Sequence, residues 1–429
     1  MQVTRRSQFS PLYFNSRPED PQMTNGWLNE IVVAVWACAS FYIMHFTGAE
    51  SAVPLIFPLA AGAITIFFLT YKKPVIATVS PLVSWGAFLL NLSILASYLF
   101  NAHRYEWVFI AGNILSSLLF FFSLYLITMR IDLDFRKTLV VSSILVNLLL
   151  PIILIKAPVV WGRVEPPENA NYVAMMALVA FLGALGVRSI IWAAALAAVP
   201  LYSMVVLQSR DSLLAAAIAL MFAVMSWTWT NRSQKFFRYL LLAFFGSGVL
   251  CGALSFAGVP VIESIGQLFE SLFMLNDKYR GISSGGSGRN EIWAAAINLW
   301  QAQPVFGVGF KGHTLLMPDQ LPAHNAYIAM LADMGVAGLT SYFLMVSRAI
   351  YFVFKPIPRF HEYPLLATII LTYILYGLFE VRAFSFGNTY SVLFMLVLFN
   401  CSKRRLDGVH SVEPRVRVVV HPVSDLIQY

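Results

Sequence analysis

Long apolar runs fill most of the chain, and short polar stretches separate them. A helix that crosses the hydrocarbon core of a membrane needs roughly 20 apolar residues, and about twelve runs approach that length. The sixth and seventh runs are short and are separated only by Arg188 and Ser189. The predicted spans are 28–47, 53–71, 75–100, 107–128, 138–157, 172–187, 189–207, 213–230, 239–260, 326–347, 364–382 and 386–401. The pattern predicts an all-α, polytopic integral membrane protein.

Composition supports this interpretation. Hydrophobic residues make up 59% of the chain and charged residues only 12%, which excludes a soluble domain of 429 residues. The net charge of +8 does not indicate nucleic-acid binding, because the basic residues lie in short loops between apolar runs. The cysteines are Cys38, Cys251 and Cys401, and all lie in or beside apolar runs. An odd, buried set of this kind predicts neither a disulfide framework nor a metal site.

The distribution of Lys and Arg predicts the orientation in the membrane. Twenty of the 29 basic residues fall on the side that holds both termini, and nine fall on the other side. Basic residues favour the cytoplasmic side, so both termini are predicted to be cytoplasmic. The expected organisation is a retained cytoplasmic N-tail, nine spans, an outer loop, three more spans and a cytoplasmic C-tail. Their ranges are 1–26, 27–260, 261–325, 326–401 and 402–429.

The outer loop at 261–325 is too long to be a simple connection, and loops of this length usually carry function. Apolar residues recur in it at helical spacing, which predicts two amphipathic helices along the membrane interface. The first set is Ile262, Ile265, Phe269, Leu272 and Phe273, and the second is Ile292, Ala296, Leu299 and Trp300. The glycine-serine stretch between them predicts a hinge.

Two arginines on the outer side are candidate anion ligands. Arg210 ends the seventh span, and Arg289 opens the helix after the hinge. A guanidinium offers a planar set of donors that suits phosphate oxygens, and a helix N-terminus adds free N–H groups. The alternatives are an interfacial anchor or a pair with Asp211 for Arg210, and a solvated pair with Glu291 for Arg289.

His324 lies where the outer loop enters the tenth span, and a near-neutral imidazole there can accept a proton from an attacking hydroxyl. The alternative is a structural histidine, which is our interpretation of His313. A further polar group precedes the sixth span and is either a substrate-binding or a solvated stretch; it comprises Arg163, Glu165, Glu168, Asn171 and Tyr172. Trp161, Trp293 and Trp300 suit stacking on sugars or an interfacial aromatic belt.

The predicted outer face lacks several kinds of catalytic motif. It has no Cys/His cluster, no close carboxylate pair for a divalent metal and no GxSxG elbow. We therefore expect no metal and no cofactor. Ionisable residues are also scarce within the spans, with Glu30 and Asp333 among the few. Ion-coupled transporters usually place such groups at the midplane, which argues against that class.

The block from Gly288 to Gly335 resembles the signature region of the bacterial O-antigen ligase and polymerase superfamily. The resemblance rests on the order and spacing of Gly288-Arg289, Trp293, Pro304, Gly307, Gly309, His324-Asn325 and Gly335. Upstream, Ser209-Arg210 and Asn171 are similar to the family's Ser-Arg pair and span-opening asparagine. The resemblance covers roughly residues 160–345. The chain departs from the pattern at Asp211, whose negative charge works against anion binding.

The resemblance implies a glycosyltransferase-C-like fold with a partly helical periplasmic loop, in the bacterial inner membrane. It implies transfer of a glycan from undecaprenyl pyrophosphate to a sugar hydroxyl of lipid A-core, with inversion and without a metal. Arg210 and Arg289 would hold the pyrophosphate, and His324 would act on the acceptor. We expect the substrate-binding set to be Arg163, Asn171, Asp211, Asn325 and Trp293.

Two alternatives remain open. A polymerase extending O-antigen or exopolysaccharide chains, or a protein glycosylase, would share these motifs. A transporter of lipid-linked glycans would share the spans and the cations, but it should carry charge along its whole path rather than at one face.

Overall fold

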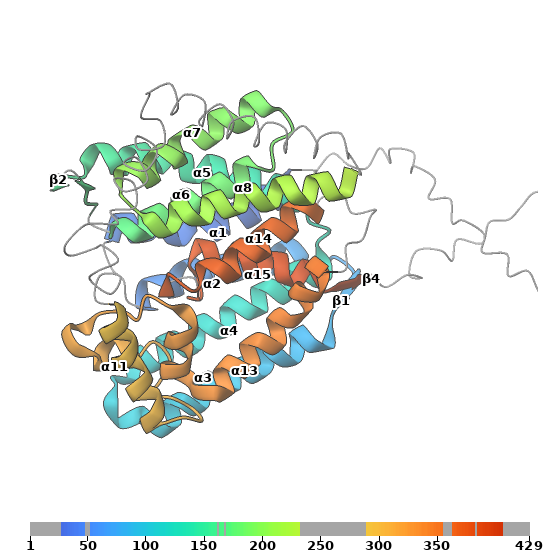
Figure 1. The fold of residues 1–429 in the computed structure, drawn as a ribbon. Helices are drawn as coiled ribbons and strands as arrows, with labels where there is room; N and C mark the ends of the chain where they lie inside the picture. The colour runs from blue at the N-terminus through green and yellow to red at the C-terminus, as the bar shows by residue number, and fades with distance from the viewer. Residues whose placement is uncertain are drawn as a thin grey trace, which may run out of the picture.

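The computed structural model describes residues 27–47, 52–160, 163–166, 169–231, 289–354, 363–381 and 384–405. Within these ranges the long helices run side by side in one bundle (Figure 1). The bundle helices are α1 (Leu28–Thr47), α2 (Ala52–Thr70), α3 (Pro81–Asn101), α4 (Trp107–Arg130), α5 (Phe135–Lys156), α6 (Ala170–Ala184), α7 (Ile190–Val206), α8 (Arg210–Asn231), α13 (Ala326–Phe354), α14 (Tyr363–Tyr376) and α15 (Thr389–Cys401). The shorter elements are η2 (Ala102–Arg104), α11 (Arg289–Ala302), α12 (His313–Leu316) and η4 (Pro318–Gln320).

Each predicted span that falls within the described residues is a helix. Of the predicted spans, only 239–260 lies wholly outside them, as does the first of the two predicted interface helices. The second interface helix is confirmed as α11. Among the residues that the structure describes, four helical segments are long and apolar enough to cross a membrane, and six shorter apolar helices accompany them. The four are Pro81–Arg104, Trp107–Arg130, Phe135–Lys156 and Ala326–Phe354. The chain is an all-α, polytopic membrane protein, as its apolar pattern predicts.

The third span begins later than predicted because a short strand precedes it. Strand β1 (Ala77–Val79) pairs antiparallel with β4 (Lys403–Arg405). Helix α3 then starts at Pro81, and proline suits the first helical turn because that turn needs no backbone N–H donor. Strand β4 belongs to the predicted C-tail at 402–429, so that tail begins within the folded body. The rest of the tail and the N-tail at 1–26 lie outside the described residues.

Burial separates lipid-facing helices from central ones. The outer helices expose many apolar side chains, for example Leu99, Ile155 and Ile190. In α6 and α15, by contrast, almost every side chain is buried. A helix that is apolar on all sides and buried on all sides lies inside a bundle. The most extensive helix pairs are α3 with α13, α2 with α4, α8 with α14, and α5 with α6.

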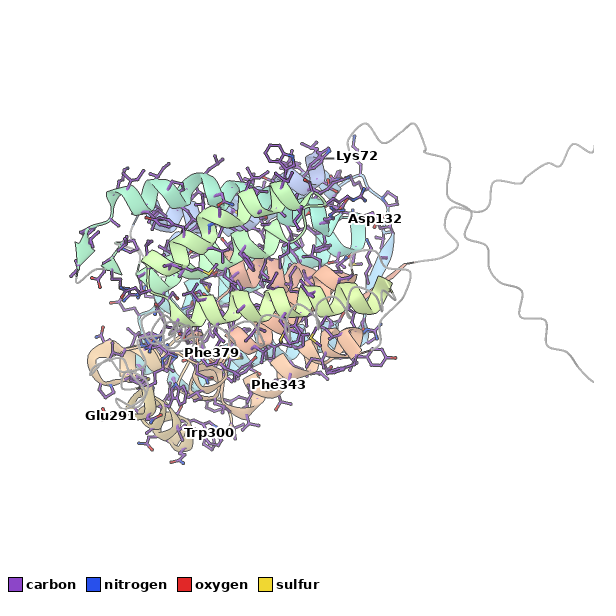
Figure 2. The ribbon with its side chains drawn as sticks, turned by 45° about the horizontal axis from the view of Figure 1, so that its top comes forward. Lys72, Asp132, Glu291, Trp300, Phe343 and Phe379 are labelled. Carbon is purple, nitrogen blue, oxygen red and sulfur yellow. The ribbon has the colours of Figure 1, made fainter. Side chains whose placement is uncertain are left out.

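The bundle has two distinct ends. Strands β1 and β4 lie at one end, while α11 lies at the other, together with the hairpin of β2 (Val159–Val160) and β3 (Arg163–Val164) (Figure 1). Figure 2 shows Lys72 and Asp132 near the first end, and Glu291 and Trp300 near the second. Lys72 therefore lies at the first end, and Arg289, the first residue of α11, lies at the second. Which end faces the periplasm stays a prediction.

Helix α13 is broken at Gly335, where φ is 62° and ψ is −163°. Only glycine adopts this conformation without strain. A Cβ here would also lie 2.3 Å from the carbonyl oxygen of Val305. The break frees backbone N–H groups, and Val336 and Ala337 donate theirs to the carbonyls of Pro304 and Val305 at 2.9 and 3.1 Å. The segment after α11 is therefore docked onto the break.

Gly307 and Gly309 complete this docking. Both have positive φ, and a Cβ on Gly307 would lie 2.4 Å from the carbonyl carbon of Asp333. The N–H of Gly309 donates to the carbonyl of Asp333 at 2.9 Å. On the other side of the segment, the hydroxyl of Tyr105 donates to the carbonyl of Val308 at 2.7 Å. The glycines of the signature region therefore let one loop approach two helices closely.

Candidate active site

The turn between α7 and α8 presents Arg210 and Asp211 as the first residues of α8. A buried hydroxyl chain fixes this turn to α14. Ser209 Oγ donates to Ser212 Oγ at 3.1 Å, and Ser212 Oγ lies 3.0 Å from the hydroxyl of Tyr376. All three side chains are buried. The start of α8 is thus held firmly, while Arg210 and Asp211 remain half-buried at the rim.

Arg289 and Asp211 meet in a direct ion pair between α11 and α8. Nη2 of Arg289 lies 2.5 Å from Oδ2 of Asp211, and each side chain is 20% exposed. The structure therefore brings together two of the predicted site residues that are 78 positions apart in sequence. The sequence suggests Arg210 as a partner for Asp211 and Glu291 as a partner for Arg289; the structure pairs Asp211 with Arg289.

Helix α11 connects this ion pair to the loop that carries His324. Trp293 lies one turn after Arg289 on the same face, since four residues advance a helix by about 6 Å. Its indole Nε1 donates to the carbonyl of Ala323 at 2.8 Å. Buried alanines pack below this contact, because Ala296 of α11 and Ala323 share a cluster with Ala329 and Ala332 of α13. Trp293 therefore anchors the residue that directly precedes His324.

His324 is half-buried and has a left-handed backbone, with φ of 48°. Such a conformation is uncommon outside glycine, and histidine is one of the residues that tolerate it. The next residue, Asn325, caps α13: its Oδ1 accepts from the N–H groups of Tyr327 and Ile328, both at 3.0 Å. Its amide also donates to the carbonyl of Leu378 at 3.1 Å. Both sides of His324 are therefore anchored.

Arg163 and Asn171 also lie together near the α7–α8 turn. Nε of Arg163 donates to the carbonyl of Leu207 at 2.8 Å, and Nη2 lies 3.3 Å from Oδ1 of Asn171. Leu207 precedes Arg210 by three positions, so β3 is tied to the same turn. Asn171 lies in the first turn of α6, as the motif predicted. Trp161 and Glu168 lie outside the described residues.

Sequence analysis missed a buried charged group beside this site. Oδ1 of Asp333 accepts from both the backbone N–H of His313, at 2.8 Å, and from its ring Nδ1, at 2.9 Å. Both side chains are almost fully buried. Asp333 was noted only as an ionisable residue in an apolar span, and that scarcity was the available signal. His313 was interpreted as structural, and its buried contacts agree with that interpretation.

Two groups near Asp333 have pKa values shifted from their ordinary values. Burial lowers the pKa of Lys311 to about 8, and the nearby Asp333 carboxylate partly opposes this change. Burial, followed by the charge of Asp333, raises the pKa of Tyr105 to about 12. Both residues lie in connections outside the spanning helices. Within the described ranges, no group of three or more His, Cys, Asp or Glu comes together.

Residues 193–343 match the family model for O-antigen ligase. This stretch of the chain is similar to that family. The match runs from α7 into α13 and includes Arg210, Asp211, Arg289, Trp293, His324 and Asn325, whereas Arg163 and Asn171 precede it. It confirms the superfamily that the signature region predicted. No curated protein matches the chain.

The O-antigen ligase domain supports an activity of the ligase or polymerase type. It supports a glycosyltransferase that uses lipid-linked polysaccharide. Together with the apolar helices, it supports a bacterial membrane protein. The acceptor, the donor lipid and the catalytic residues belong to the proposal that follows.

Proposed function

We propose that this protein is an O-antigen ligase of the bacterial inner membrane, acting at the periplasmic face. It transfers a glycan from undecaprenyl pyrophosphate to a sugar hydroxyl of lipid A-core. The observation that carries the proposal is the continuity of α11, which begins with Arg289 and holds the carbonyl of Ala323 through Trp293. One turn of α11 therefore connects the proposed anion site at Arg289 to the residue that precedes His324.

In this proposal Arg210 and Arg289 bind the pyrophosphate and neutralise it as it leaves. The acceptor hydroxyl attacks the anomeric carbon, the bond from that carbon to the pyrophosphate oxygen breaks, and His324 takes the hydroxyl proton. A single displacement of this kind inverts the anomeric centre. Because pyrophosphate is a good leaving group, positioning and charge neutralisation are sufficient and the reaction needs no metal.

The remaining predicted substrate residues divide into two groups in this proposal. Trp293 and Asn325 hold the loop of His324, which favours a positioning role over direct substrate contact. Arg163 and Asn171 contact each other near the α7–α8 turn and extend the polar surface beside Arg210. Asp211 belongs to neither group, because its carboxylate is paired with Arg289.

The proposal is tested with purified protein in vesicles, supplied with the lipid-linked glycan and lipid A-core. We expect glycosylated core and released undecaprenyl pyrophosphate, with full activity in excess chelator. Arg289→Lys and Arg210→Lys keep the charge but lose the two-pronged contact, so each should slow transfer by about ten- to a hundredfold. Arg104→Lys, an exposed arginine in η2, is the matched control. Wild-type turnover by both site variants would reject the proposed site.

The same assay separates the alternatives. A polymerase would lengthen the lipid-linked glycan itself and leave the core acceptor unmodified. A transporter would move the glycan across the vesicle membrane without forming a new glycosidic bond. Either result would replace the ligase assignment, whereas a metal requirement would reject the metal-free mechanism alone.

A further inference from the structure

The Arg289 guanidinium is already paired with a carboxylate of the same protein, that of Asp211. The contact joins one guanidinium nitrogen, Nη2, to one carboxylate oxygen of Asp211 at 2.5 Å. It is therefore not the two-pronged contact that an arginine makes with a well-matched oxyanion. Each side chain is 20% exposed, so the pair is accessible to a ligand rather than sealed in the core. Any anion that binds Arg289 must compete with Asp211.

Asp211 cannot easily move away from Arg289 when another anion binds there. It is followed by Ser212, whose buried hydroxyl contacts both Ser209 and Tyr376. The hydroxyl of Tyr376 is also close enough to Glu380, Asp211 and Arg289 to interact electrostatically with all three. The first turn of α8 is thus fixed to α14, and a displaced Asp211 carboxylate would remain beside the incoming anion.

This arrangement treats singly and doubly charged ligands differently. A singly charged phosphodiester replaces one ion pair with another and gains a repulsive neighbour in Asp211, so the exchange is unfavourable. A pyrophosphate diester carries two charges. Its second phosphate can contact the guanidinium of Arg210, which directly precedes Asp211 in α8, so the pyrophosphate meets two cations where a phosphodiester meets one.

We propose that Asp211 is a specificity-determining residue that admits pyrophosphate-linked donors to Arg289 and excludes singly charged phosphodiesters, such as the headgroups of anionic membrane lipids. The proposal rests on the proposed function, because it assumes that Arg289 binds the donor pyrophosphate. It assigns a use to the one residue at which the chain departs from the family pattern. A neutral residue at 211 would leave Arg289 open to the phosphodiesters that surround every membrane enzyme.

The test compares wild type with Asp211→Asn in vesicles of phosphatidylcholine containing increasing fractions of phosphatidylglycerol. Asparagine keeps the shape and an acceptor oxygen but removes the charge. For wild type we expect the KM for the donor to stay within about twofold across the series. For Asp211→Asn we expect the KM to be about tenfold lower without phosphatidylglycerol, and to rise about tenfold or more as this lipid is added.

Glu291→Gln is the matched control, because Glu291 is an exposed acid in the first turn of α11, two residues from Arg289. It should behave as wild type; the same lipid sensitivity in this variant would attribute the effect to general charge and overturn the proposal. An Asp211→Asn variant with wild-type KM throughout would also overturn it. So would loss of transfer as severe as that of Arg289→Lys, which would make Asp211 a support for Arg289. If Arg289→Lys turns over normally, the proposed function itself fails.

Discussion

The segment between α11 and α13 carries two histidines, and its two halves are held in different ways. Around His313, the ring and the backbone are buried and bound to one carboxylate of Asp333. Around His324, the neighbours are held by Trp293 and by the α13 cap, while the histidine itself is half-buried and left-handed. Anchoring the neighbours of a residue fixes the position of its backbone.

This contrast distinguishes a histidine that stabilises the loop from one that is presented by it. A buried imidazole that is hydrogen-bonded to a carboxylate has little access to a substrate hydroxyl. His324 is only half-buried and is oriented by two fixed neighbours, although its Nδ1 atom is itself buried. We therefore expect substitution of His324 to reduce activity, and loss of the contacts of His313 to reduce stability. Variants at each position test this contrast directly.

The largest expected effect is on transfer by His324→Ala. Removing a general base costs about 100- to 10,000-fold in rate, while binding of the lipid-linked donor should remain near wild type. The wild-type rate should also fall as pH is lowered through the range in which an imidazole gains a proton, and this dependence should vanish in the variant. Transfer of radiolabelled glycan and donor binding are measured separately.

His313→Asn is the comparison variant for His324→Ala in the same transfer assay. The Asn side-chain amide can donate to Asp333 from nearly the position of the imidazole Nδ1–H, so transfer should stay within a few-fold of wild type. If His313→Asn abolishes transfer and His324→Ala does not, the roles of the two histidines are reversed.

Asp333→Leu should cause the largest loss of stability. It leaves the backbone N–H and the ring of His313 buried without their acceptor, at a cost of about 2–5 kcal/mol in free energy of unfolding. Asp333→Asn keeps an acceptor oxygen and should lose less. Thermal unfolding of the solubilised protein measures both. Asp132→Leu is the control, since the side chain of Asp132 is 62% exposed and its partner Lys403 also donates to the carbonyl of Ile131.

Gly335→Ala tests whether docking at the helix break stabilises the loop of both histidines. The positive φ and the clash with Val305 should together cost at least about 2 kcal/mol in unfolding free energy. Gly377→Ala is the control, because its added Cβ would lie 3.2 Å from the hydroxyl of Tyr327 and its φ is ordinary. Equal melting temperatures for the two variants would contradict a strained break.

The smallest effect concerns Lys311, beside Asp333. Because the pKa of Lys311 is lowered to about 8 in the folded protein from the ordinary lysine value of 10.5, the folded state binds fewer protons than the unfolded state between these values. Unfolding free energy should therefore rise with pH from about 8 to 10.5. Lys311→Met should remove this rise and stabilise the protein below pH 8 by about 1 kcal/mol, a value reduced because the side chain is partly exposed. A pH profile unchanged by the substitution would contradict the lowered pKa.

The sequence alone determined the spans and the helix of the outer loop. Inside a membrane the backbone must satisfy its own hydrogen bonds, so an apolar run of sufficient length becomes a helix almost regardless of its neighbours. Helical spacing of Ile292, Ala296 and Leu299 likewise predicted α11. The signature motif selected Arg210, Arg289 and His324, and the family match covers all three. These are local or ordered signals that a linear chain carries.

Only the tertiary structure decided which side chains meet. Asp211 and Arg289 are 78 positions apart, and Asp333 and His313 are 20 positions apart. Neither separation follows a helical or strand period, so no pattern in the chain predicts the contact. Both depend on how α8, α11 and α13 pack, and packing is set by the shapes of many side chains together rather than by any one of them. The sequence therefore contained the chemical groups of the site, and the fold determined their partners.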